Sequence, residues 1–423
     1  MEWDTESKCN LNCRHCLLFG LLSCDSLNLE DKKRVVDLLV ANNVYSLVIP
    51  AMEPLIFPEV VDFFKYCRYS GVKISLTTNG TLINEAIASE VAKGGFKYVS
   101  ISLEGFSEKT NDIVRGAGSF GKAIAGINTL VNKCNKNSLP MPIVIQVCIN
   151  EINYEEILDS LDKFLLRYPT VTVSFGSVFG MGKAKKNPDL LLPRGKYVDI
   201  IQNILCRYPD CRDKILVKEL TIFEKLFFNF KFDLNMPANP QNCHACIDRF
   251  SIMPDGNLCR CNLLLGSEVV PRELVILNRS IFDLPNVKID DISEKYGILK
   301  KGFCLKCPFC NECNICMIYT KDRCVLPELV ESCEKNYNEI INICNEIVSE
   351  KIKFKFKSDL KFLKRGRCIV ICDRGGKKIE IISNGLIDIS KVESGVQLNY
   401  CDFRIGEDLI LKLLLNDLIR SSI

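Results

Sequence analysis

Residues 8–16 read KCNLNCRHC, which places Cys9, Cys13 and Cys16 in a C-x3-C-x2-C spacing. Three thiolates in so short a loop can hold three irons of a [4Fe–4S] cluster, and without a fourth nearby ligand one iron stays open to a substrate or cofactor. An open coordination position distinguishes a reactive metal site from a structural one. Zinc usually takes paired C-x2-C sequences and a fourth ligand, so the spacing favours an iron–sulfur cluster over zinc.

The whole chain is rich in cysteine but otherwise ordinary in composition. Of its 423 residues, 24 are cysteine and 47% are hydrophobic, which is enough to form cores without disulfide staples. A net charge of +3 predicts no binding to nucleic acid and none to an anionic membrane. The acidic start is unlike a signal peptide, and no apolar run reaches the roughly 20 residues that span a bilayer. We therefore expect a cytoplasmic protein whose reduced cysteines bind metal.

Strand and helix patterns alternate after the cysteine loop. Apolar, β-rich runs predict strands at Glu2–Thr5, Tyr45–Pro50, Val72–Thr78, Lys97–Leu103, Ile143–Ile149 and Thr170–Gly176. Helical periodicity predicts helices at Leu29–Ala41, Pro58–Ser70, Asn84–Lys93, Ser119–Asn135 and Asn153–Tyr168. The alternation indicates an α/β fold of parallel βα units, although a doubly wound sheet would have the same periodicity. Six strands are too few to close an eight-stranded barrel, so we expect a partial (β/α)6 TIM-like barrel with ligands at the strand carboxyl ends.

Changes in composition divide the chain into four expected segments. We expect the barrel at residues 1–190, a helical bridge at 191–242, a cysteine-rich domain at 243–335 and a small α+β C-terminal unit at 336–423. Within the last segment the patterns predict a β-hairpin and an amphipathic helix. The hairpin strands are Arg367–Cys372 and Lys378–Ser383, and the helix is Glu407–Ile419.

Five further motifs stand at or shortly after successive strand ends. In order they are Ala51-Met52-Glu53-Pro54, Thr77-Thr78-Asn79-Gly80, Ser102-Leu103-Glu104-Gly105, Arg115-Gly116 and Gly180-Met181-Gly182-Lys183-Ala184. Together with the cysteine triad they resemble the radical S-adenosylmethionine (SAM) superfamily, whose motifs are GGEP, TNG, SLDG, RG and GRA. The first motif departs from that pattern, because Ala51 and Met52 replace two glycines and resist the backbone conformations that glycine allows.

The resemblance implies a cofactor, a reaction and its contacts. In that superfamily the open iron binds the amino and carboxylate groups of SAM, and electron transfer from the cluster cleaves SAM to a 5′-deoxyadenosyl radical that abstracts hydrogen. The implied SAM contacts are His15 near the adenine, Glu53 at the amino group, Asn79 in its loop, Ser102 on the segment that faces the ribose, and Arg115 at the SAM carboxylate.

The second cysteine region resembles the SPASM extension of radical SAM enzymes that modify peptides and proteins. Cys246 lies ten residues before Gly256, and Cys261 follows that glycine by five. Asp255-Gly256 predicts a β-hairpin turn that brings distant cysteines together. One later spacing differs, with two residues instead of three before Cys316. In the sulfatase-maturing relatives an Asp follows the cysteine equivalent to Cys261, whereas here Asn262 follows it.

The SPASM resemblance implies one or two auxiliary [4Fe–4S] clusters. One ligand set would be Cys243, Cys246, Cys261 and Cys316, and the other Cys304, Cys307, Cys313 and Cys333, with Cys324 as an alternative to Cys333. Zinc stays an alternative here, because closely spaced cysteine pairs are common zinc ligands. Four other cysteines fall within helical or strand patterns and are interpreted as small buried hydrophobic residues. They are Cys67, Cys134, Cys148 and Cys206.

The resemblance therefore implies an enzyme that modifies a ribosomally made precursor peptide, with an electron donor such as flavodoxin or ferredoxin. We expect a crosslink such as a thioether, because closing a bond after hydrogen abstraction leaves one electron for auxiliary clusters to remove. The alternatives are a peptide epimerase, a sulfatase-type protein maturase, a radical SAM enzyme for a small molecule, and a non-catalytic Fe–S or zinc scaffold. The C-terminal unit could bind the peptide at a sheet edge or serve only as a packing lid.

Overall fold

The computed structural model describes most of the N-terminal half of the chain and parts of the rest. The described residues are 1–20, 22, 24–50, 52–136, 142–209, 214–218, 220, 228–229, 232, 251–259, 262 and 276–282, together with the backbone of five short strands between 354 and 421. In this part of the chain no helix is both long and apolar enough to cross a membrane. The expected domain boundaries at 242 and 335 lie outside the described residues and stay predictions.

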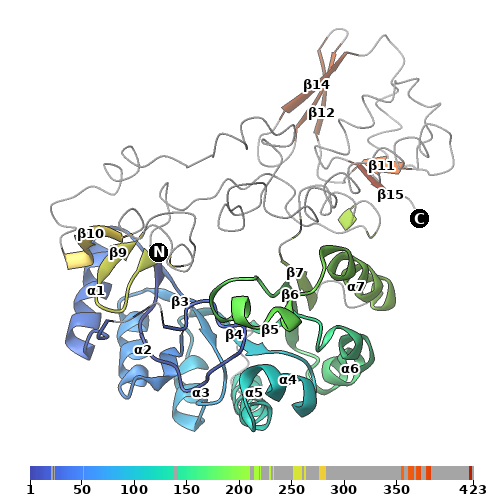
Figure 1. Ribbon diagram of the computed structural model, residues 1–423. Coiled ribbons are helices and arrows are strands. Elements are labelled where there is room, and N and C mark those ends of the chain that lie inside the picture. Colours follow the sequence, from blue (N-terminus) through green and yellow to red (C-terminus); the bar gives the residue numbers. More distant parts are fainter. Residues whose placement is uncertain are drawn as a thin grey trace.

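Parallel strands in chain order form the centre of a ten-stranded sheet (Figure 1). They are β1 (Glu2–Trp3), β2 (Ser46–Ile49), β3 (Lys73–Thr78), β4 (Phe96–Leu103), β5 (Ile143–Ile149), β6 (Val171–Ser177) and β7 (Ile215–Val217). Each strand pairs in parallel with the next one along the chain. A doubly wound sheet would reverse its strand order part-way, so this order confirms the partial TIM-like barrel. The strand β7 was not predicted.

A hairpin from the second cysteine region extends the sheet at its other edge. Strand β8 (Ser251–Ile252) pairs in parallel with β1 and antiparallel with β9 (Asn257–Cys259), which pairs with β10 (Ile276–Ser280). The predicted turn at Asp255-Gly256 is confirmed: Gly256 has a φ of +85°, and the Asp255 carboxylate accepts the Asn257 N–H. The sequence did not predict that this hairpin joins the free edge of β1.

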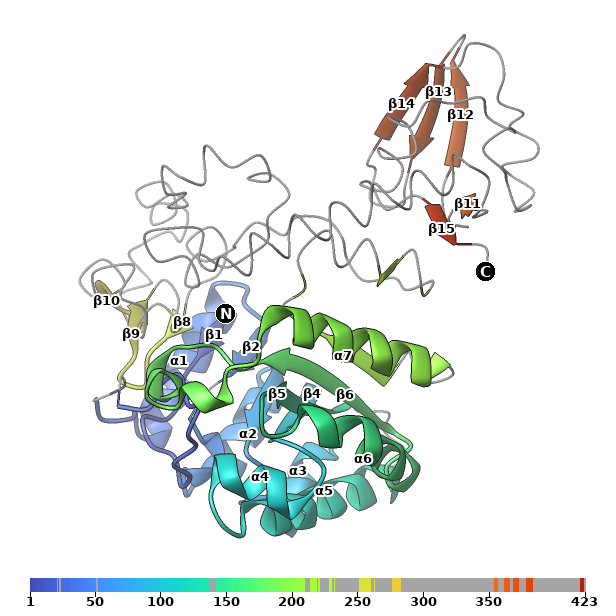
Figure 2. The same cartoon turned by 45° about the vertical axis from the view of Figure 1, so that its right-hand side comes forward.

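Helices connect the strands and cover the outer face of the barrel (Figure 2). They are α1 (Leu29–Ala41), α2 (Val60–Tyr69), α3 (Glu85–Val91), α4 (Glu108–Arg115), α5 (Ser119–Lys136), α6 (Tyr154–Arg167) and α7 (Arg194–Arg207), with 3-10 turns η1 (Pro54–Ile56), η2 (Gly182–Lys186) and η3 (Pro188–Leu190). The five helices predicted between the strands are confirmed with small shifts at their ends. The short α4 was not predicted; the Ser107 hydroxyl caps it by accepting the Thr110 N–H.

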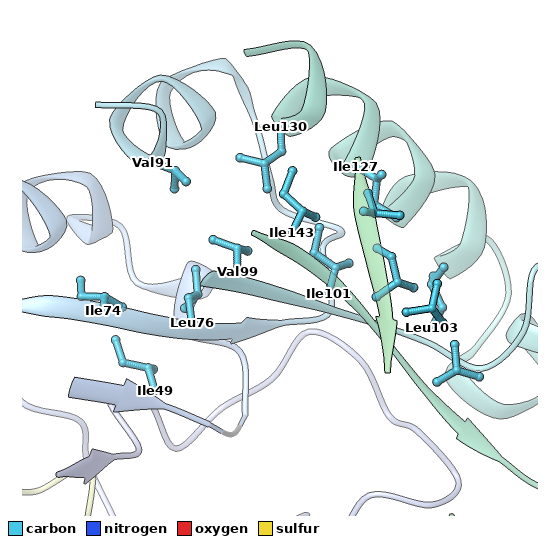
Figure 3. Packing of buried hydrophobic residues seen from close by; sticks show 14 of the residues in the cluster. Ile49, Ile74, Leu76, Val91, Val99, Ile101, Leu103, Ile127, Leu130 and Ile143 are labelled. Atoms are coloured by element: carbon cyan, nitrogen blue, oxygen red, sulfur yellow. The ribbon is translucent and has the colours of Figure 1, made fainter. Parts of the chain in front are cut away.

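Alternation along the strands separates an apolar face from a polar one. In β5 the side chains of Ile143, Ile145, Val147 and Ile149 are buried, whereas those between them are partly exposed. The buried set packs with α5 and its neighbours in one continuous core (Figure 3). Burying one such aliphatic side chain contributes roughly 1.5–3 kcal/mol. The opposite face of β5, with Gln146 and Cys148, therefore lines the barrel interior.

The described strands between residues 354 and 421 form two small sheets. One is antiparallel and three-stranded, formed by β12 (Lys361–Arg365), β13 (Cys368–Cys372) and β14 (Lys378–Ile382), and the other pairs β11 (Phe354–Phe356) with β15 (Ile419–Ser421). The predicted hairpin is confirmed as β13 and β14, whereas β12 was not predicted. The predicted helix at Glu407–Ile419 is wrong at its last residue, because Ile419 begins β15. The rest of that helix lies outside the described residues.

Candidate active site

The three cysteines of the first motif lie on the loop that follows β1. Cys9, Cys13 and Cys16 are all partly buried. Burial raises the pKa of the Cys9 thiol and raises that of Cys13 to about 11, and the neighbouring thiols add to both shifts. All three thiols lie on one loop segment of eight residues, 9–16. Three thiol donors on one loop suit an iron–sulfur cluster, which deprotonates its ligands on binding.

The segment after β6 holds this loop in place. The Arg14 guanidinium lies 2.7 Å from the Asp189 carboxylate, and the Lys183 N–H donates to the Cys16 carbonyl at 3.0 Å. Gly182 has a φ of +55°, and a Cβ there would lie 2.5 Å from the Cys16 carbonyl oxygen. The GMGKA motif at 180–184 thus lies directly against the third cysteine, where only glycine allows the close approach.

The motif around Glu53 connects the end of β2 to the end of β3. The Glu53 carboxylate is fully buried and accepts three hydrogen bonds: from the Thr78 hydroxyl at 2.7 Å, the Asn79 N–H at 2.8 Å and the Leu55 N–H at 3.1 Å. Burial raises the pKa of Glu53, and these hydrogen bonds oppose the shift. The predicted SAM contact is therefore also a structural anchor of its own loop.

Asn79 lies between that anchor and the cysteine loop. Its side-chain amide donates to the side-chain Oδ1 of Asn10 at 2.8 Å and approaches the Cys9 sulfur at 3.8 Å. Its own Oδ1 accepts from the Thr81 N–H and hydroxyl. Asn79 thus orients the first cysteine, a role that its place in a TNG motif did not predict.

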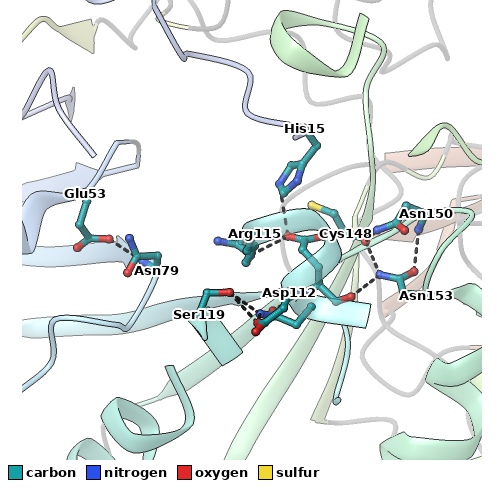
Figure 4. Close-up of polar contacts among 11 residues, drawn as sticks. His15, Glu53, Asn79, Asp112, Arg115, Ser119, Cys148, Asn150 and Asn153 are labelled. Carbon is teal, nitrogen blue, oxygen red and sulfur yellow. Dashed lines mark hydrogen bonds and ion pairs between the residues drawn. The ribbon is translucent and has the colours of Figure 1, made fainter. Parts of the chain in front are cut away.

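A buried group of charged side chains lies at the carboxyl ends of β4 and β5. The Glu104 Oε1 atom is 2.7 Å from Nη2 of Arg115 and 3.4 Å from Nε2 of His15 (Figure 4). Burial lowers the pKa of His15, so the imidazole is neutral near pH 7. Although burial opposes it, the charge of Glu104 raises the pKa of Arg115 above its usual value. The structure thus brings together two predicted site residues, His15 and Arg115, through Glu104, which belongs to the Ser102-Leu103-Glu104-Gly105 motif but was not predicted as a contact.

Two atoms of this group lack partners. Glu104 Oε2 and His15 Nδ1 are buried and accept or donate no hydrogen bond within the described part of the chain. Buried polar atoms are nearly always paired, so unpaired ones point to a polar ligand. A ligand with hydroxyl and amine groups, such as SAM, fits this pair of atoms.

Ser102 and Cys148 lie on the interior face of the barrel. Ser102 alternates with the buried Ile101 and Leu103 of β4, and it is partly exposed. The Cys148 sulfur is within 4.8 Å of ligand atoms of both His15 and Glu104. The interpretation of Cys148 as a buried hydrophobic residue is wrong, because its parity in β5 turns it inward.

The other cysteines of that set divide between core and surface. Cys67 and Cys134 are buried in the helices, as predicted. Cys206 is exposed on α7, which contradicts the sequence interpretation. Its helix has a buried face of Tyr197, Ile201 and Ile204, and Cys206 lies outside this face.

Residues 7–164 of the chain match the radical SAM superfamily. This segment is a radical SAM domain. It contains the cysteine loop, the Glu53 and Asn79 contacts, and the His15, Glu104 and Arg115 group. The superfamily implies SAM and a [4Fe–4S] cluster as the cofactors of this domain, and the cysteine loop and the two unpaired buried atoms are consistent with them.

Two curated relatives are similar to part of this chain. The AdoMet-dependent heme synthase of Methanosarcina barkeri is 29% identical over 165 residues, which are 38% of this chain and 46% of that protein. The mycofactocin maturase MftC of Mycobacterium ulcerans is 32% identical over 131 residues, which are 31% of this chain and 36% of that protein. The chain therefore spans less than half the length of either relative.

A solved structure extends the similarity of fold beyond the radical SAM domain. Native anSMEcpe with bound AdoMet and Cp18Cys peptide has a TM-score of 0.56 at 16% sequence identity, over 82% of this chain and 98% of that chain. The expected auxiliary ligands lie outside the described residues of this chain. They are Cys243, Cys246, Cys261, Cys304, Cys307, Cys313, Cys316, Cys324 and Cys333.

Two asparagines after β5 support the radical SAM domain and were not predicted. The Asn153 side-chain amide donates to the backbone carbonyls of Glu104 and Cys148, both at 2.9 Å (Figure 4). The Asn150 N–H donates in turn to the Asn153 Oδ1 at 2.8 Å. These bonds hold the ends of β4 and β5 together beside the charged group. The signal in the sequence was the N-x-x-N spacing directly after a strand.

Proposed function

We propose that the chain is a radical SAM enzyme that modifies a ribosomally made peptide. The observation that carries the proposal is the group of His15, Glu104 and Arg115, with its unpaired buried atoms, next to a loop of three cysteines in a radical SAM domain. When bound, the cluster and SAM would supply a 5′-deoxyadenosyl radical that abstracts hydrogen. A scaffold without catalysis has no use for such a group.

The roles of this chain's residues follow from their contacts. Cys9, Cys13 and Cys16 would hold the cluster, and Arg115 would bind the SAM carboxylate through guanidinium atoms that do not contact Glu104. Glu104 Oε2 would accept a ribose hydroxyl, because it is buried and has no other partner among the described residues.

Four further side chains complete the proposed SAM site. His15 would lie beside the adenine. Ser102 would face the ribose from the interior face of β4. Glu53 accepts three hydrogen bonds within the protein and would accept a further one from the SAM amino group with its remaining lone pair. Asn79 would keep the first cysteine in place.

A peptide is the proposed substrate for two reasons. One of the two named relatives, MftC, is a maturase, and the solved neighbour was determined with a peptide. The SPASM-like spacings of residues 243–335 are the second reason, and there we propose one or two auxiliary [4Fe–4S] clusters on the cysteines named above. Such clusters would supply an electron acceptor, which favours a crosslink such as a thioether over redox-neutral epimerisation. Asn262 in place of Asp speaks against a sulfatase-type maturase.

The remaining parts of the proposal concern partners and place. We propose a cytoplasmic enzyme that takes electrons from a flavodoxin or ferredoxin. The C-terminal unit at 336–423 presents sheet edges in β12 and β14 that could pair with an extended peptide. Deleting residues 355–423 and finding unchanged peptide affinity would leave that unit as a packing lid.

The test of the function is SAM cleavage by the anaerobically reconstituted protein. With SAM and dithionite, the wild type should form 5′-deoxyadenosine, and Cys13→Ala should lose it together with close to four irons per chain. Cys206→Ala is the matched control, because this exposed thiol on α7 is far from the loop in sequence and should leave both iron content and SAM cleavage unchanged. Absence of 5′-deoxyadenosine from an iron-replete wild type would contradict the proposal.

A second candidate function is the modification of a tetrapyrrole. The AdoMet-dependent heme synthase is similar to this chain over more residues, 165, than the maturase is, 131. Incubating the reconstituted protein with SAM, reductant and either iron-coproporphyrin or the short peptides encoded by neighbouring genes separates the two. A mass change of the porphyrin alone would establish this candidate and exclude the peptide.

A further inference from the structure

The interior face of β5 and β6 is polar below the proposed SAM site. Gln146 of β5 and Ser174 of β6 are direct partners in the parallel register. Both side chains alternate with fully buried residues of the outer core, such as Val147 and Phe175. An ordinary TIM barrel fills this interior with branched aliphatic side chains. Here two hydrogen-bonding side chains lie side by side on it.

Lys218 adds a positive charge to this pair. Its backbone is fixed after β7, because its N–H donates to the Phe175 carbonyl at 2.8 Å and its carbonyl accepts the Tyr197 hydroxyl at 2.7 Å. Its ammonium donates to Gln146 Oε1 at 2.5 Å. No carboxylate in the described part of the chain forms an ion pair with it, so a neutral amide is the partner that the structure assigns to this charge.

Ser174 supplies an independent observation. The residue is fully buried, and its hydroxyl has no hydrogen-bond partner among the described residues. Leaving a buried hydroxyl unpaired costs stability. Among the described residues, the exposed Lys218 ammonium has only an amide as partner and the Ser174 hydroxyl of β6 has none, and an anionic ligand would satisfy both.

The position of these groups relates them to the reaction. Gln146 lies two residues before Cys148 on the same face of β5, a separation of about 7 Å, and the Cys148 sulfur is within 4.8 Å of the His15 and Glu104 ligand atoms. Arg115 in that group is already paired with Glu104. If a carboxylate of a larger ligand binds at Lys218 and Gln146, the atoms of that ligand next to the carboxylate would therefore lie close to the proposed SAM site.

We propose that Gln146, Ser174 and Lys218 bind a carboxylate of the substrate peptide. The proposal rests on the peptide-modifying function above and specifies its substrate. The Lys218 ammonium, the Gln146 amide N–H and the Ser174 hydroxyl provide three donors for the two oxygens of one carboxylate. The carboxylate is either an acidic side chain near the modified residue or the C-terminus of the peptide.

Four hexapeptides distinguish these two sources. They are acetyl-AAEAAA-amide, acetyl-AAQAAA-amide, acetyl-AAAAAA with a free C-terminus, and the same peptide with a C-terminal amide. Binding to the SAM-loaded holoprotein is measured by NMR line broadening. The wild type should bind one of the two carboxylate peptides about tenfold more tightly than its amide counterpart. Preference for the glutamate peptide assigns a side chain, and preference for the free acid assigns the C-terminus.

Two variants test the residues. Lys218→Gln should remove the tenfold preference, whereas Lys196→Gln, which removes an exposed lysine paired with Glu151, should keep it. Ser174→Ala should reduce the preference and at the same time raise the unfolding midpoint, because it deletes an unpaired buried hydroxyl. A purely structural Ser174 or Lys218 would leave the preference unchanged in its variant.

The outcomes separate this inference from the proposed function. Formation of 5′-deoxyadenosine without peptide should be equal in the wild type and Lys218→Gln. If SAM is cleaved but all four peptides bind equally or not at all, the carboxylate site is wrong and the radical SAM activity stands. If SAM is not cleaved by the iron-replete wild type, the proposed function fails, and a carboxylate preference lost in Lys218→Gln would still establish the site.

Discussion

Arg115 and Glu104 form a buried ion pair, in which Nη2 of the guanidinium lies 2.7 Å from Oε1 of the carboxylate. The resemblance assigned Arg115 to the SAM carboxylate alone, but the structure makes it half of a pair. The Glu104 carboxylate is fully buried and the Arg115 side chain is only 11% exposed, so each compensates most of the cost of burying the other. The two residues therefore act together in folding as well as in the proposed binding of SAM.

We expect Glu104→Gln to destabilise the protein by about 3 kcal/mol, because it leaves a buried guanidinium without its counter-charge. Urea unfolding of the anaerobic holoprotein measures the change as a shift in midpoint at constant slope. The matched control is Glu151→Gln, which breaks the exposed pair with Lys196 and should cost less than about 1 kcal/mol. If the two variants lose the same free energy of unfolding, the buried pair contributes no more to stability than the exposed one.

Met52 adopts a backbone conformation that suits glycine, with a φ of +57°. A side chain in this left-handed region costs roughly 1–2 kcal/mol, which a substitution by glycine would remove. Part of that stabilisation is lost again, because glycine has more conformational entropy in the unfolded chain. We expect Met52→Gly to raise stability by about 1 kcal/mol, measured by thermal unfolding. Asn43, at +59°, is the control: Asn tolerates this region, so Asn43→Gly should change stability by only a few tenths. A loss of stability in Met52→Gly would mean that packing of the methionine outweighs its strain.

The Met52 result shows what motif comparison can and cannot give. The replaced glycines indicated a loop with altered geometry, yet the chain keeps the left-handed conformation and accepts its strain. Glu53 still reaches the end of β3 through three hydrogen bonds. A local motif thus predicts which residue makes a contact, here Glu53 with the end of β3. It does not predict that the backbone at Met52 adopts a left-handed conformation that is unfavourable for methionine.

The fold was predictable where periodicity is local. The strand and helix order of the barrel follows from alternating patterns of Val, Ile and Leu, which are buried on one side of each strand. The pairing of β8 with β1 joins residues about 250 positions apart in the chain, and no local pattern encodes it. The inward turn of Cys148 was readable from its parity between Val147 and Ile149, but a thiol fits either environment.

Asp4 makes stability depend on pH. It is buried where β1 ends, and the Asn262 amide lies 3.2 Å from its carboxylate. Burial raises the pKa of Asp4 to about 7, although the Asn262 hydrogen bond opposes the shift. A raised carboxyl pKa favours the folded state while the group is protonated. Its contribution is therefore complete below about pH 4 and is lost as the pH rises toward 7.

We expect Asp4→Asn to be more stable than the wild type at pH 8 and to show a flatter stability profile between pH 4 and 7. The difference across this window should be on the order of 4 kcal/mol. Urea unfolding at five pH values measures it. Asp62→Asn, an exposed carboxylate of α2, is the control and should leave the wild-type profile unchanged. Parallel profiles for wild type and Asp4→Asn would show that the carboxyl titrates normally.

Cys148 offers a direct chemical test of where SAM binds. Its sulfur is within 4.8 Å of ligand atoms of His15 and Glu104, and the residue is only partly buried on the interior face. A SAM molecule held by that group would cover the thiol. We expect N-ethylmaleimide to label Cys148 in the reduced anaerobic holoprotein, and SAM at about ten times its Kd to slow labelling about tenfold. Peptide mass mapping measures the rate at each cysteine separately.

Two other cysteines serve as controls for this labelling. Cys206 on α7 is exposed and should react at the same rate with and without SAM, whereas the buried Cys67 should stay unlabelled, because burial also raises its thiol pKa. Equal labelling of Cys148 in both conditions would place SAM away from His15 and Glu104, and the roles proposed for these residues would then be wrong.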